Sequence, residues 1–553
     1  MASSGNFGTW NPLNIGSGGA TSLTVGNTNA VMTGADPRTT GTVGGVISDT
    51  DGYYFETVAT SIGDGALTLG IVNEDRNNQC MGGQIHSRSG SFMWRSYDSG
   101  AFFVETSSNT SYGTFANGDI LGWYVKNSKL YVKKNNSNVV GDVANVSAGI
   151  DISGGFFFPA VSRTVGGGSQ TTAILRTDSD DWSYSPPAGF KGLTSKDMLV
   201  DSNIDPAGDD GADDNPTKQF NTVIWSGTGS SHAITGVGFK PDLVWLKQRV
   251  SFANPNIVVD STRGVTKRLE PNANLVEGTD TDGLTAFGTD GFTLGGNDKY
   301  NYGGGHTYVA WCWRANGGTT SSNTDGALTS TVQANQAAGF SISKYTCNGS
   351  GESFGHGLGA APDFFQIKKI DNQARNWSGW HTGLTTATTG YIQLNSNAGE
   401  ANDTLWNNTA PSNTVIHVKS NTTEVNNPSG DSYICYAWRS IPGYSRFGKY
   451  EGNADNNGTF VYLGFRPRMV CIKSIDSSQA WIVCDTARET FNPLGEKVLQ
   501  WNTNDAEYDP SGFNFDALSN GFKIRSSDTN INAAQTYIYM AWADVSFKYN
   551  QTF

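Results

Sequence analysis

One strand-like stretch occurs three times in this chain, and its repetition limits the folds that the chain can adopt. The copies read GFKPDLVWLK (Gly238–Lys247), GAAPDFFQIK (Gly359–Lys368) and GFRPRMVCIK (Gly464–Lys473). Between the proline and the final lysine the residues alternate, with one face apolar in every copy and the other face mixed. Alternation of this kind predicts three β-strands that each turn one face into a core, with the lysine on the mixed face.

Other markers recur in register with this strand. Three aromatic stretches, YVAWCW, YICYAW and YIYMAW, end at Trp313, Trp438 and Trp542, 72 to 76 residues after the proline. They are small or apolar on both faces, which predicts central, buried strands. The period of about 100 residues is longer than a solenoid repeat, so each copy is predicted to form its own small β-sandwich.

Composition shifts predict where the domains begin and end. An acidic stretch precedes the first repeat and a Gly/Ser/Thr-rich stretch separates the first two, as linkers do. The join at Arg439–Gly448 is short and predicts rigid coupling of the last two repeats. The predicted segments are an N-terminal β-sandwich at 1–200, an acidic linker at 201–217, repeat 1 at 218–316, a linker at 317–338, repeat 2 at 339–441 and repeat 3 at 442–553.

The composition agrees with an all-β chain and excludes several classes of function. Charged residues make up 16% of the 553 residues, against about 25% in ordinary globular proteins, and there are 68 glycines. The net charge is −13 and no basic run exceeds a pair, so we expect no nucleic-acid partner. The N-terminus has no signal-peptide pattern, and no apolar run is long enough for membrane insertion.

Residues before about 200 follow a different pattern, and their motifs resemble a known family. In order they are YYFETVA (Tyr53–Ala59), a hairpin at Gly118–Asn136 around KNSK, GGFFFPAVS (Gly154–Ser162) and WSYSPPAGFKGL (Trp182–Leu193). This order resembles SPRY-type domains, which are concanavalin A-like β-sandwiches of jelly-roll type. The resemblance implies that these motifs are core strands and that the loops bind a ligand, either a protein or a glycan.

The repeats resemble tandem β-domains of tailed bacteriophages. The matching motifs include GHGLGAAPDF, WNNTAPSN, GYSRFGKYEGN and the final SNGFKIRSSDTNINAAQTYIYMAWAD, over roughly residues 217–548. The first repeat departs most, since it has neither GHGLG nor WNNTAP. The resemblance implies a virion structural protein made in the host cytoplasm, a tail fibre or adhesin by expectation, with other virion proteins as partners. It also leads us to expect a homotrimer, and a host-surface glycan or protein as receptor.

Several residues could carry chemistry, but each has a structural explanation. Asp260 and Asp485 occupy matching positions, each followed by an arginine, while the middle copy has His381; we expect local salt bridges. The stretch GESFG (Gly351–Gly355) fits the pattern of a nucleophilic serine, yet the helix that such a motif needs does not follow. Six aspartates at 201–214 could bind calcium, but they lack the spacing of an EF-hand loop and are interpreted as a solvated linker.

Aromatic residues are the remaining candidates for binding. Trp377 and Trp380 could stack on sugars or pack in a core, and the core is favoured because Trp481 lies near the same place in the third copy. Trp94 and Tyr97 could lie in a pocket or in the core. The six cysteines form no CxxC pair, which predicts buried thiols without a disulfide or zinc framework.

The sequence therefore predicts a non-enzymatic display protein with no catalytic residue, cofactor or metal. The first alternative is a head fibre or decoration protein bound to the capsid, and the second is a polysaccharide depolymerase, which would need paired carboxylates in a groove. A secreted bacterial lectin is a third. The segment Met1–Ser22 is a candidate anchor to the particle.

Overall fold

The computed structural model describes residues 8–194 and 215–544, apart from short internal segments. These gaps are 17–19, 35, 64–65, 79–84, 86–87, 98–99, 110–111, 145–147, 164–168, 251–253, 428–429 and 511. Cys80 and the aspartates at 201–214 therefore lie outside the described residues. So do residues 1–7 and 17–19 of the candidate anchor, Met1–Ser22. Strands account for 45% of the residues and helices for 4%, which confirms the all-β fold class.

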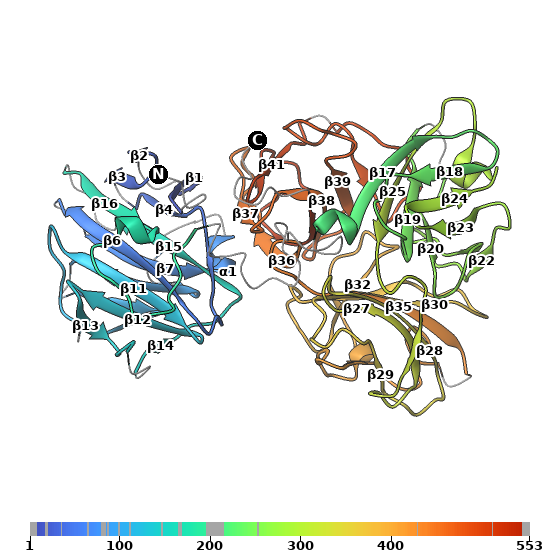
Figure 1. The fold of residues 1–553 in the computed structure, drawn as a ribbon, viewed down its shortest axis with the longest axis horizontal. Helices are drawn as coiled ribbons and strands as arrows, with labels where there is room; N and C mark the ends of the chain where they lie inside the picture. Colours follow the sequence, from blue (N-terminus) through green and yellow to red (C-terminus); the bar gives the residue numbers. More distant parts are fainter. Residues whose placement is uncertain are drawn as a thin grey trace. The chain divides into compact units, whose positions relative to one another are not determined.

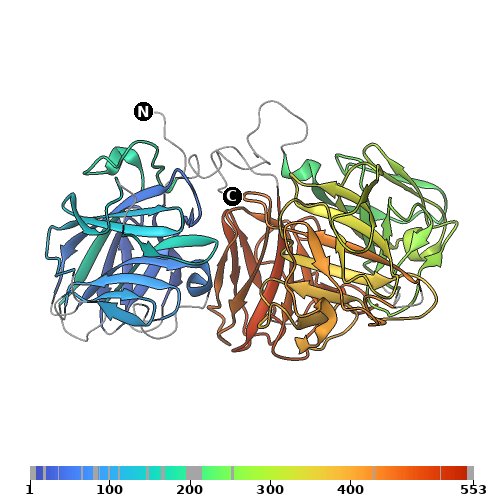
Figure 2. The ribbon, with the colours of Figure 1, turned by 90° about the horizontal axis from the view of Figure 1, so that it is seen from below.

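Contacts divide the chain into two compact units, the first built from residues 1–201 and the second mainly from 202–458 and 465–547. The first unit is a sandwich of two antiparallel sheets, drawn in blue to teal in Figures 1 and 2. One sheet contains β1 (Trp10–Ile15), β4 (Arg38–Gly41), β15 (Phe156–Arg163), β7 (Leu67–Asn73), β8 (Ser91–Arg95), β9 (Phe102–Val104) and β10 (Ser107–Asn109), with β5 (Gly45–Val46) beside β15. The other contains β13 (Ser137–Val140), β12 (Lys129–Lys134), β11 (Ile120–Lys126), β6 (Tyr53–Ser61), β16 (Thr171–Arg176), β3 (Asn29–Thr33) and β2 (Ala20–Thr24), with β14 (Ile150–Asp151) beside β12.

The predicted hairpin of this unit is present in detail. Strands β11 and β12 pair from Leu121 with Lys134 to Lys126 with Lys129, leaving a two-residue turn. Both turn residues, Asn127 and Ser128, have positive φ angles of 51° and 59°, as a turn that matches the twist of a hairpin requires. Large side chains such as Phe55, Trp123 and Phe157 then fill the space between the sheets.

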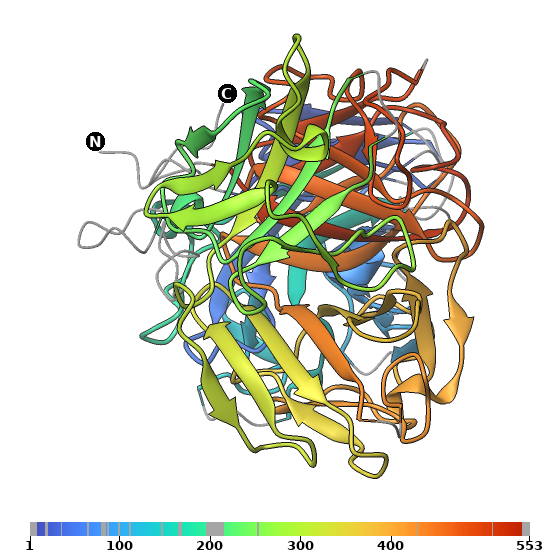
Figure 3. The same ribbon diagram turned by 90° about the vertical axis from the view of Figure 1, so that its right-hand side faces the viewer.

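The second unit contains three related sheets, one from each repeat. They are coloured green, yellow to orange, and orange to red in Figure 1, and Figure 3 shows the same unit from its side. The first is β17 (Phe220–Ser226), β25 (Thr307–Trp313), β19 (Leu243–Gln248) and β20 (Ile257–Asp260). The second is β26 (Ser321–Asn323), β27 (Ser330–Asn335), β28 (Phe340–Thr346), β35 (Ser432–Trp438), β30 (Phe364–Lys369), β31 (Ser378–His381), β32 (Gly390–Gln393) and β33 (Ala401–Asn402). The third is β36 (Ser445–Glu451), β43 (Thr536–Ala543), β38 (Pro467–Ser474), β39 (Ile482–Asp485) and β40 (Leu499–Gln500).

Each repeat adds at least one small sheet, and short helical turns occur in both units. The small sheets of repeat 1 are β18 (His232–Thr235), β24 (Gly291–Leu294) and β23 (Leu284–Gly288), and β21 (Lys267–Arg268) with β22 (Gly278–Thr279). Repeat 2 adds β29 (Ser353–Gly355) with β34 (Val415–His417), and repeat 3 adds β37 (Phe460–Tyr462), β42 (Gly521–Ile524) and β41 (Phe515–Leu518), paired in that order. The helical turns are α1 (Glu74–Asn77), η1 (Ser179–Asp181), η2 (Pro216–Lys218), α3 (Asp298–Asn301) and η3 (Thr404–Trp406).

The segment 317–338, predicted as a linker, contains two strands of the second repeat. β26 and β27 extend the edge of its main sheet, and β27 pairs with β28 from Ser330 to Asn335. The Ser/Thr/Gly-rich composition suggested a linker, but Leu328 and Val332 are buried. Polar residues alternating with buried ones are normal at a sheet edge that is solvated on one side.

The repeated proline-lysine strand is buried on both faces, which the mixed face did not predict. In β19 all six residues are buried, and the same holds for β30. Leu243 and Trp245 belong to a core that includes residues of all three repeats, whereas Val244 and Leu246 face a separate core within the first repeat. The mixed face is therefore the face through which the repeats pack on one another.

Candidate functional site

The strongest convergence of side chains lies where the three repeats meet. Trp313, Trp438 and Trp542, the last residues of the predicted aromatic stretches, come together in one cluster. Their ring centroids are 5.8 Å apart for Trp313 and Trp438, 5.3 Å for Trp313 and Trp542, and 6.2 Å for Trp438 and Trp542. Each pair is edge-to-face, an arrangement favoured by the quadrupoles of aromatic rings. The three equivalent indoles thus form a triangle at the centre of the second unit.

The recurrent lysine connects each repeat to the one before it. Lys247 Nζ donates to the carbonyl of Asn504 in the third repeat (2.9 Å). Lys368 donates in the same way to Asn274 of the first repeat (3.2 Å), and Lys473 to Asn397 of the second (3.1 Å). Each ammonium also donates to a carbonyl of its own repeat. Burial lowers the pKa of all three lysines to about 8.

Backbone hydrogen bonds follow the same cycle. The amides of Glu277, Glu400 and Glu507 each donate to a carbonyl that lies eight residues after the repeat proline of another repeat. The acceptors are Ile370 (3.0 Å), Ile475 (2.7 Å) and Arg249 (2.8 Å), respectively. Together with the lysine contacts, these bonds join repeats 1 and 2, 2 and 3, and 3 and 1. The three repeats therefore form a closed ring with pseudo-threefold symmetry.

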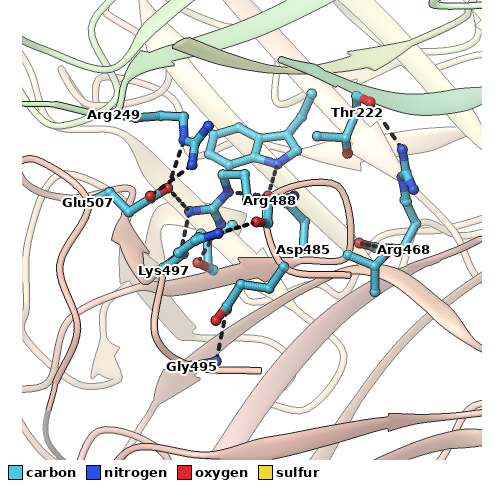
Figure 4. A network of polar contacts seen from close by, with 12 residues as sticks. Thr222, Arg249, Arg468, Asp485, Arg488, Gly495, Lys497 and Glu507 are labelled. Atoms are coloured by element: carbon cyan, nitrogen blue, oxygen red, sulfur yellow. Dashed lines mark hydrogen bonds and ion pairs between the residues drawn. The ribbon is translucent and has the colours of Figure 1, made fainter. Parts of the chain in front are cut away.

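Asp485 and Arg488 form the ion pair that their spacing predicted, and the pair lies inside the seam between repeats 3 and 1 (Figure 4). Both side chains are fully buried and their Nε–Oδ2 distance is 2.6 Å. Arg488 also reaches Glu507 (3.0 Å), which receives two further hydrogen bonds of 2.9 Å from Arg249. Burial opposes the ionisation of Glu507, but the hydrogen bond from Arg249 and the charge of Arg488 outweigh it and lower its pKa. Trp311 of repeat 1 donates to Asp485 (3.1 Å) and completes this network.

Repeat 1 contains the equivalent pair, and repeat 2 replaces it. Asp260 binds Arg263 at 2.5 Å and accepts a 2.7 Å hydrogen bond from the hydroxyl of Tyr436 in repeat 2. In repeat 2, His381 accepts from the amide of Gly383 (2.9 Å), so its other ring nitrogen donates to the carbonyl of Tyr539 in repeat 3 (3.2 Å). These side chains are used for contacts within and across the seams, and Asp260, His381, Asp485 and Arg488 are all buried.

The sugar-stacking candidates of the second repeat are buried. Trp377 is 1% exposed and Trp380 is 5% exposed. Trp377 donates its indole N–H to the carbonyl of Glu270 in repeat 1 (3.0 Å), and Trp481 makes the corresponding contacts from repeat 3 to repeat 2. Trp380 lies against Phe365 in β30 with its ring nearly parallel. Both tryptophans pack in the shared core, so their rings are not available to a ligand in this conformation.

The two candidates of the first unit have different surroundings. Trp94 in β8 is fully buried and donates to the carbonyls of Gly100 and Gly113 at 3.1 and 2.9 Å. Tyr97, two residues after the end of β8, is 57% exposed. The structure therefore places Trp94 in the sandwich core and leaves Tyr97 on the surface.

Ser353 has no nucleophile geometry. It begins the short strand β29, and its hydroxyl accepts a hydrogen bond from the amide of Ala327 (3.1 Å). A nucleophile elbow needs the serine at a sharp turn between a strand and a helix. His417 is opposite Ser353 in the β29–β34 pair, but no hydrogen bond joins their side chains. The GESFG motif is thus part of a small sheet.

A polar cavity in the first repeat was not found from the sequence. It has a volume of about 360 Å³ and opens between η2, the end of β25 and the loop before β19. Lys218, Lys240 and Arg314 line it together with Thr289 and Asn316. The three cations are far apart in sequence, and only the fold brings them together. The sequence offered one sign of this cavity. Lys240 directly precedes Pro241 and Arg314 directly follows Trp313, and both Pro241 and Trp313 are repeat markers.

The described part of the chain has neither a cluster of metal-ligating side chains nor a helix that could span a membrane. No group of three or more His, Cys, Asp or Glu side chains in the described ranges is arranged to hold a metal ion. The five cysteines in this part of the chain are buried free thiols. None of its helices is long and apolar enough to span a bilayer.

Comparisons with known proteins describe the two parts of the chain differently. No curated protein matches the chain. Among solved structures, the SPRY domain of human HERC1 matches with a TM-score of 0.23 and 11% identity over 30% of this chain and 96% of that one. A human SPRY domain (TM-score 0.22, 15% identity, 28% and 94% coverage) and the carbohydrate-binding module CBM66 from Bacillus subtilis (0.20, 14%, 31% and 93%) also match. The N-terminal motifs predicted a sandwich of this type, and the first unit consists of two antiparallel sheets.

The family comparison concerns the repeats. A family model described as a domain of unknown function, DUF7483, matches residues 215–545. This range contains all three repeats and every seam contact between them, so the family unit coincides with the closed ring. Because the match extends over more than half of the chain, the protein belongs to the DUF7483 family.

Proposed function

We propose that this protein is a structural component of a tailed-bacteriophage virion, a tail fibre or adhesin that contributes to attachment to the host surface. The resemblance of the repeat motifs to phage β-domains motivates the proposal. The observation that supports a display role is the closed ring, in which the recurrent Lys, Asp, His and Trp residues are all used for contacts between repeats. The loops and outer surfaces, which these seam contacts do not use, are then the parts in which the repeats can differ.

The ring also affects how contacts would be displayed. Tandem sandwiches could have lengthened a projecting arm, but three repeats around one core form a compact head instead. Such a head presents three related surfaces at fixed angles, and several weak contacts on one rigid body add through avidity.

A homotrimer is part of the proposal, as expected for a fibre. Since each chain closes its own ring, the contacts of such a trimer would use surfaces outside the seams. Light scattering of the purified chain tests this part: three times the 59.1 kDa of one chain supports the trimer, and 59.1 kDa overturns it.

Immunogold electron microscopy of intact particles tests the central proposal, with antibodies raised against residues 442–544. Gold at the tail tip supports the adhesin, and blocking of host adsorption by the same antibodies is then expected. Gold scattered over the capsid overturns the tail assignment and favours the head fibre or decoration protein. Release of sugars from host polysaccharide by the purified protein would favour the depolymerase, and absence of gold from particles overturns the virion proposal altogether.

A further inference from the structure

The cavity of the first repeat gathers positive charge in a chain that is acidic as a whole. The net charge is −13, yet Lys218, Lys240 and Arg314 line one cavity, and none of the described lining residues is a carboxylate. Two carboxylates adjoin the lining: Asp242 is buried, whereas Asp290 is exposed and directly follows Thr289, and backbone amides donate to both. Asp242 accepts from Ala315 and Gly317 at 2.7 and 2.8 Å, and Asp290 from Gly236 and Gly238 at 3.0 and 2.6 Å.

Backbone carbonyls hold the two lysine ammoniums in place. Lys218 ends η2, and its ammonium donates to the carbonyl of Gly238 (3.2 Å). Lys240 donates to the carbonyl of Gly317 (2.9 Å) on the opposite side. Arg314 directly follows β25, and its amide donates to the carbonyl of Gln219 (2.9 Å). An ammonium has three donors, so each lysine can offer further hydrogen bonds to a bound anion.

The other repeats provide an internal comparison. The positions before the repeat proline and after the last tryptophan hold Lys240 and Arg314 in repeat 1. In repeat 2 they hold Ala361 and Arg439, and in repeat 3 Arg466 and Ala543. Arg466 is paired with Asp544 at 2.5 Å, and Arg439 donates to the carbonyl of Gln336 at 2.7 Å. Two cations at these positions therefore occur in the first repeat alone.

We infer that this cavity binds a carboxylated sugar residue of an acidic surface polysaccharide, an inference that rests on the proposed attachment function and specifies its ligand. A volume of about 360 Å³ is within the range of small-molecule sites and far above that of a bare ion. Three cations match a carboxylate through charge-assisted hydrogen bonds. The Thr289 hydroxyl and the Asn316 amide can meet sugar hydroxyls, and Phe239 adds an apolar wall.

The probes are digalacturonate, its neutral methyl ester and inorganic phosphate, each titrated into the full-length protein. We expect digalacturonate to bind, with the ester and phosphate at least about tenfold weaker. The double variant Lys218→Gln/Lys240→Gln should lose at least about tenfold in affinity for digalacturonate, because each lost ammonium removes a charge-assisted bond. Lys218→Arg/Lys240→Arg should retain most of the binding.

The matched control is Lys126→Gln/Lys133→Gln, which removes the same charge from the first unit and should bind as the wild type does. Neither Lys218 nor Lys240 is buried, so the variants should unfold at the wild-type temperature. Equal binding by the Gln double variant, equal binding of the ester, or binding of phosphate alone overturns the inference. The outcome does not depend on particle labelling: a cavity that binds digalacturonate in a protein absent from the tail would contradict the adhesin and leave the site established.

Discussion

At the scale of single residues, one position of the repeat shows how a buried seam tolerates different chemistry. Asp260 and Asp485 each form an ion pair with the arginine three residues later. In repeat 2 the same position is His381, and the residue three places later is Leu384. Burial lowers the pKa of His381 to about 3, so the ring stays neutral and needs no counter-ion. The missing arginine therefore follows from the change of Asp to His.

This neutrality predicts a pH dependence. The pKa of His381 is about 3 in the folded protein and about 6.5 when unfolded, so below pH 6.5 protons bind the unfolded chain preferentially. The residue should contribute stability above pH 6.5 and lose about 2 kcal/mol of it between pH 7 and pH 5. In His381→Gln this loss is absent, so the wild-type advantage in urea unfolding should shrink by that amount. A difference that stays constant from pH 7 to pH 5 would show that His381 is charged in the fold.

The lysines buried in the seams predict a change of stability at alkaline pH, in contrast to the acid range of His381. Burial lowers the pKa of Lys368 to about 8, below the 10.5 of the unfolded chain, so deprotonation favours the folded state. Stability should rise with pH from about 8 upward, by about 2 kcal/mol per lysine between pH 7 and pH 9.5. Lys368→Met removes this rise, and parallel urea-unfolding curves for the two proteins across that range would contradict it. Lys344→Met, on an intermediate surface position of β28, is the control.

At the scale of elements, the sequence predicted the central strands well and their partners poorly. YVAWCW, YICYAW and YIYMAW are apolar on both faces, and the structure confirms β25, β35 and β43 as strands with a neighbour on each side. For β30 and β38 the second face carries Gln366 and Cys471, and this mixture hid the fact that it is buried. The polarity of the side chains shows whether a face of a strand can be exposed to solvent. It does not show whether another repeat covers that face.

The same limit explains the candidate site. The salt bridges of Asp260 and Asp485 are local in sequence, so a spacing of three residues was enough to predict them. The cavity joins Lys218, Lys240 and Arg314 across almost 100 residues, and no period of the sequence marks that juxtaposition. Trp377 could be assigned to packing only by analogy with Trp481, because a buried and an exposed tryptophan have the same sequence context.

The tryptophan triangle predicts that the three central strands unfold together. Trp313 is 1% exposed and contacts the equivalent indoles of both other repeats. Trp313→Ala should lower the free energy of unfolding by about 3–5 kcal/mol, as truncation of a large core aromatic does. Hydrogen exchange should then accelerate in β35 and β43 as well as in β25. Trp225→Ala, in the separate core of repeat 1, is the control, and faster exchange confined to repeat 1 in both variants would contradict a shared core.

At the scale of the whole molecule, the ring is the feature that the repeat period could not specify. A period of about 100 residues is compatible with independent sandwiches and with a closed assembly, because every seam includes bonds to backbone carbonyls, which any sequence supplies. The donors Glu277, Glu400 and Glu507 are all glutamates, but the bond uses their backbone amides, so the recurring residue type does not reveal the contact. The ring closes only when three such seams are present. Each repeat then donates a backbone hydrogen bond to one neighbouring repeat and accepts one from the other.

Two separate cores lead to the last prediction. The sandwich core contains Trp123, which is fully buried and donates to Thr57 (2.8 Å), while the ring core contains Trp313, and the two clusters have no residue in common. Separate cores make separate cooperative units, so calorimetry of the full-length protein should show two transitions. Trp123→Ala should lower the temperature of one transition and Trp313→Ala that of the other, each leaving its counterpart within about 1 °C. If either substitution shifted both transitions equally, the two units would fold as one, and the ring could not be treated as an independent head.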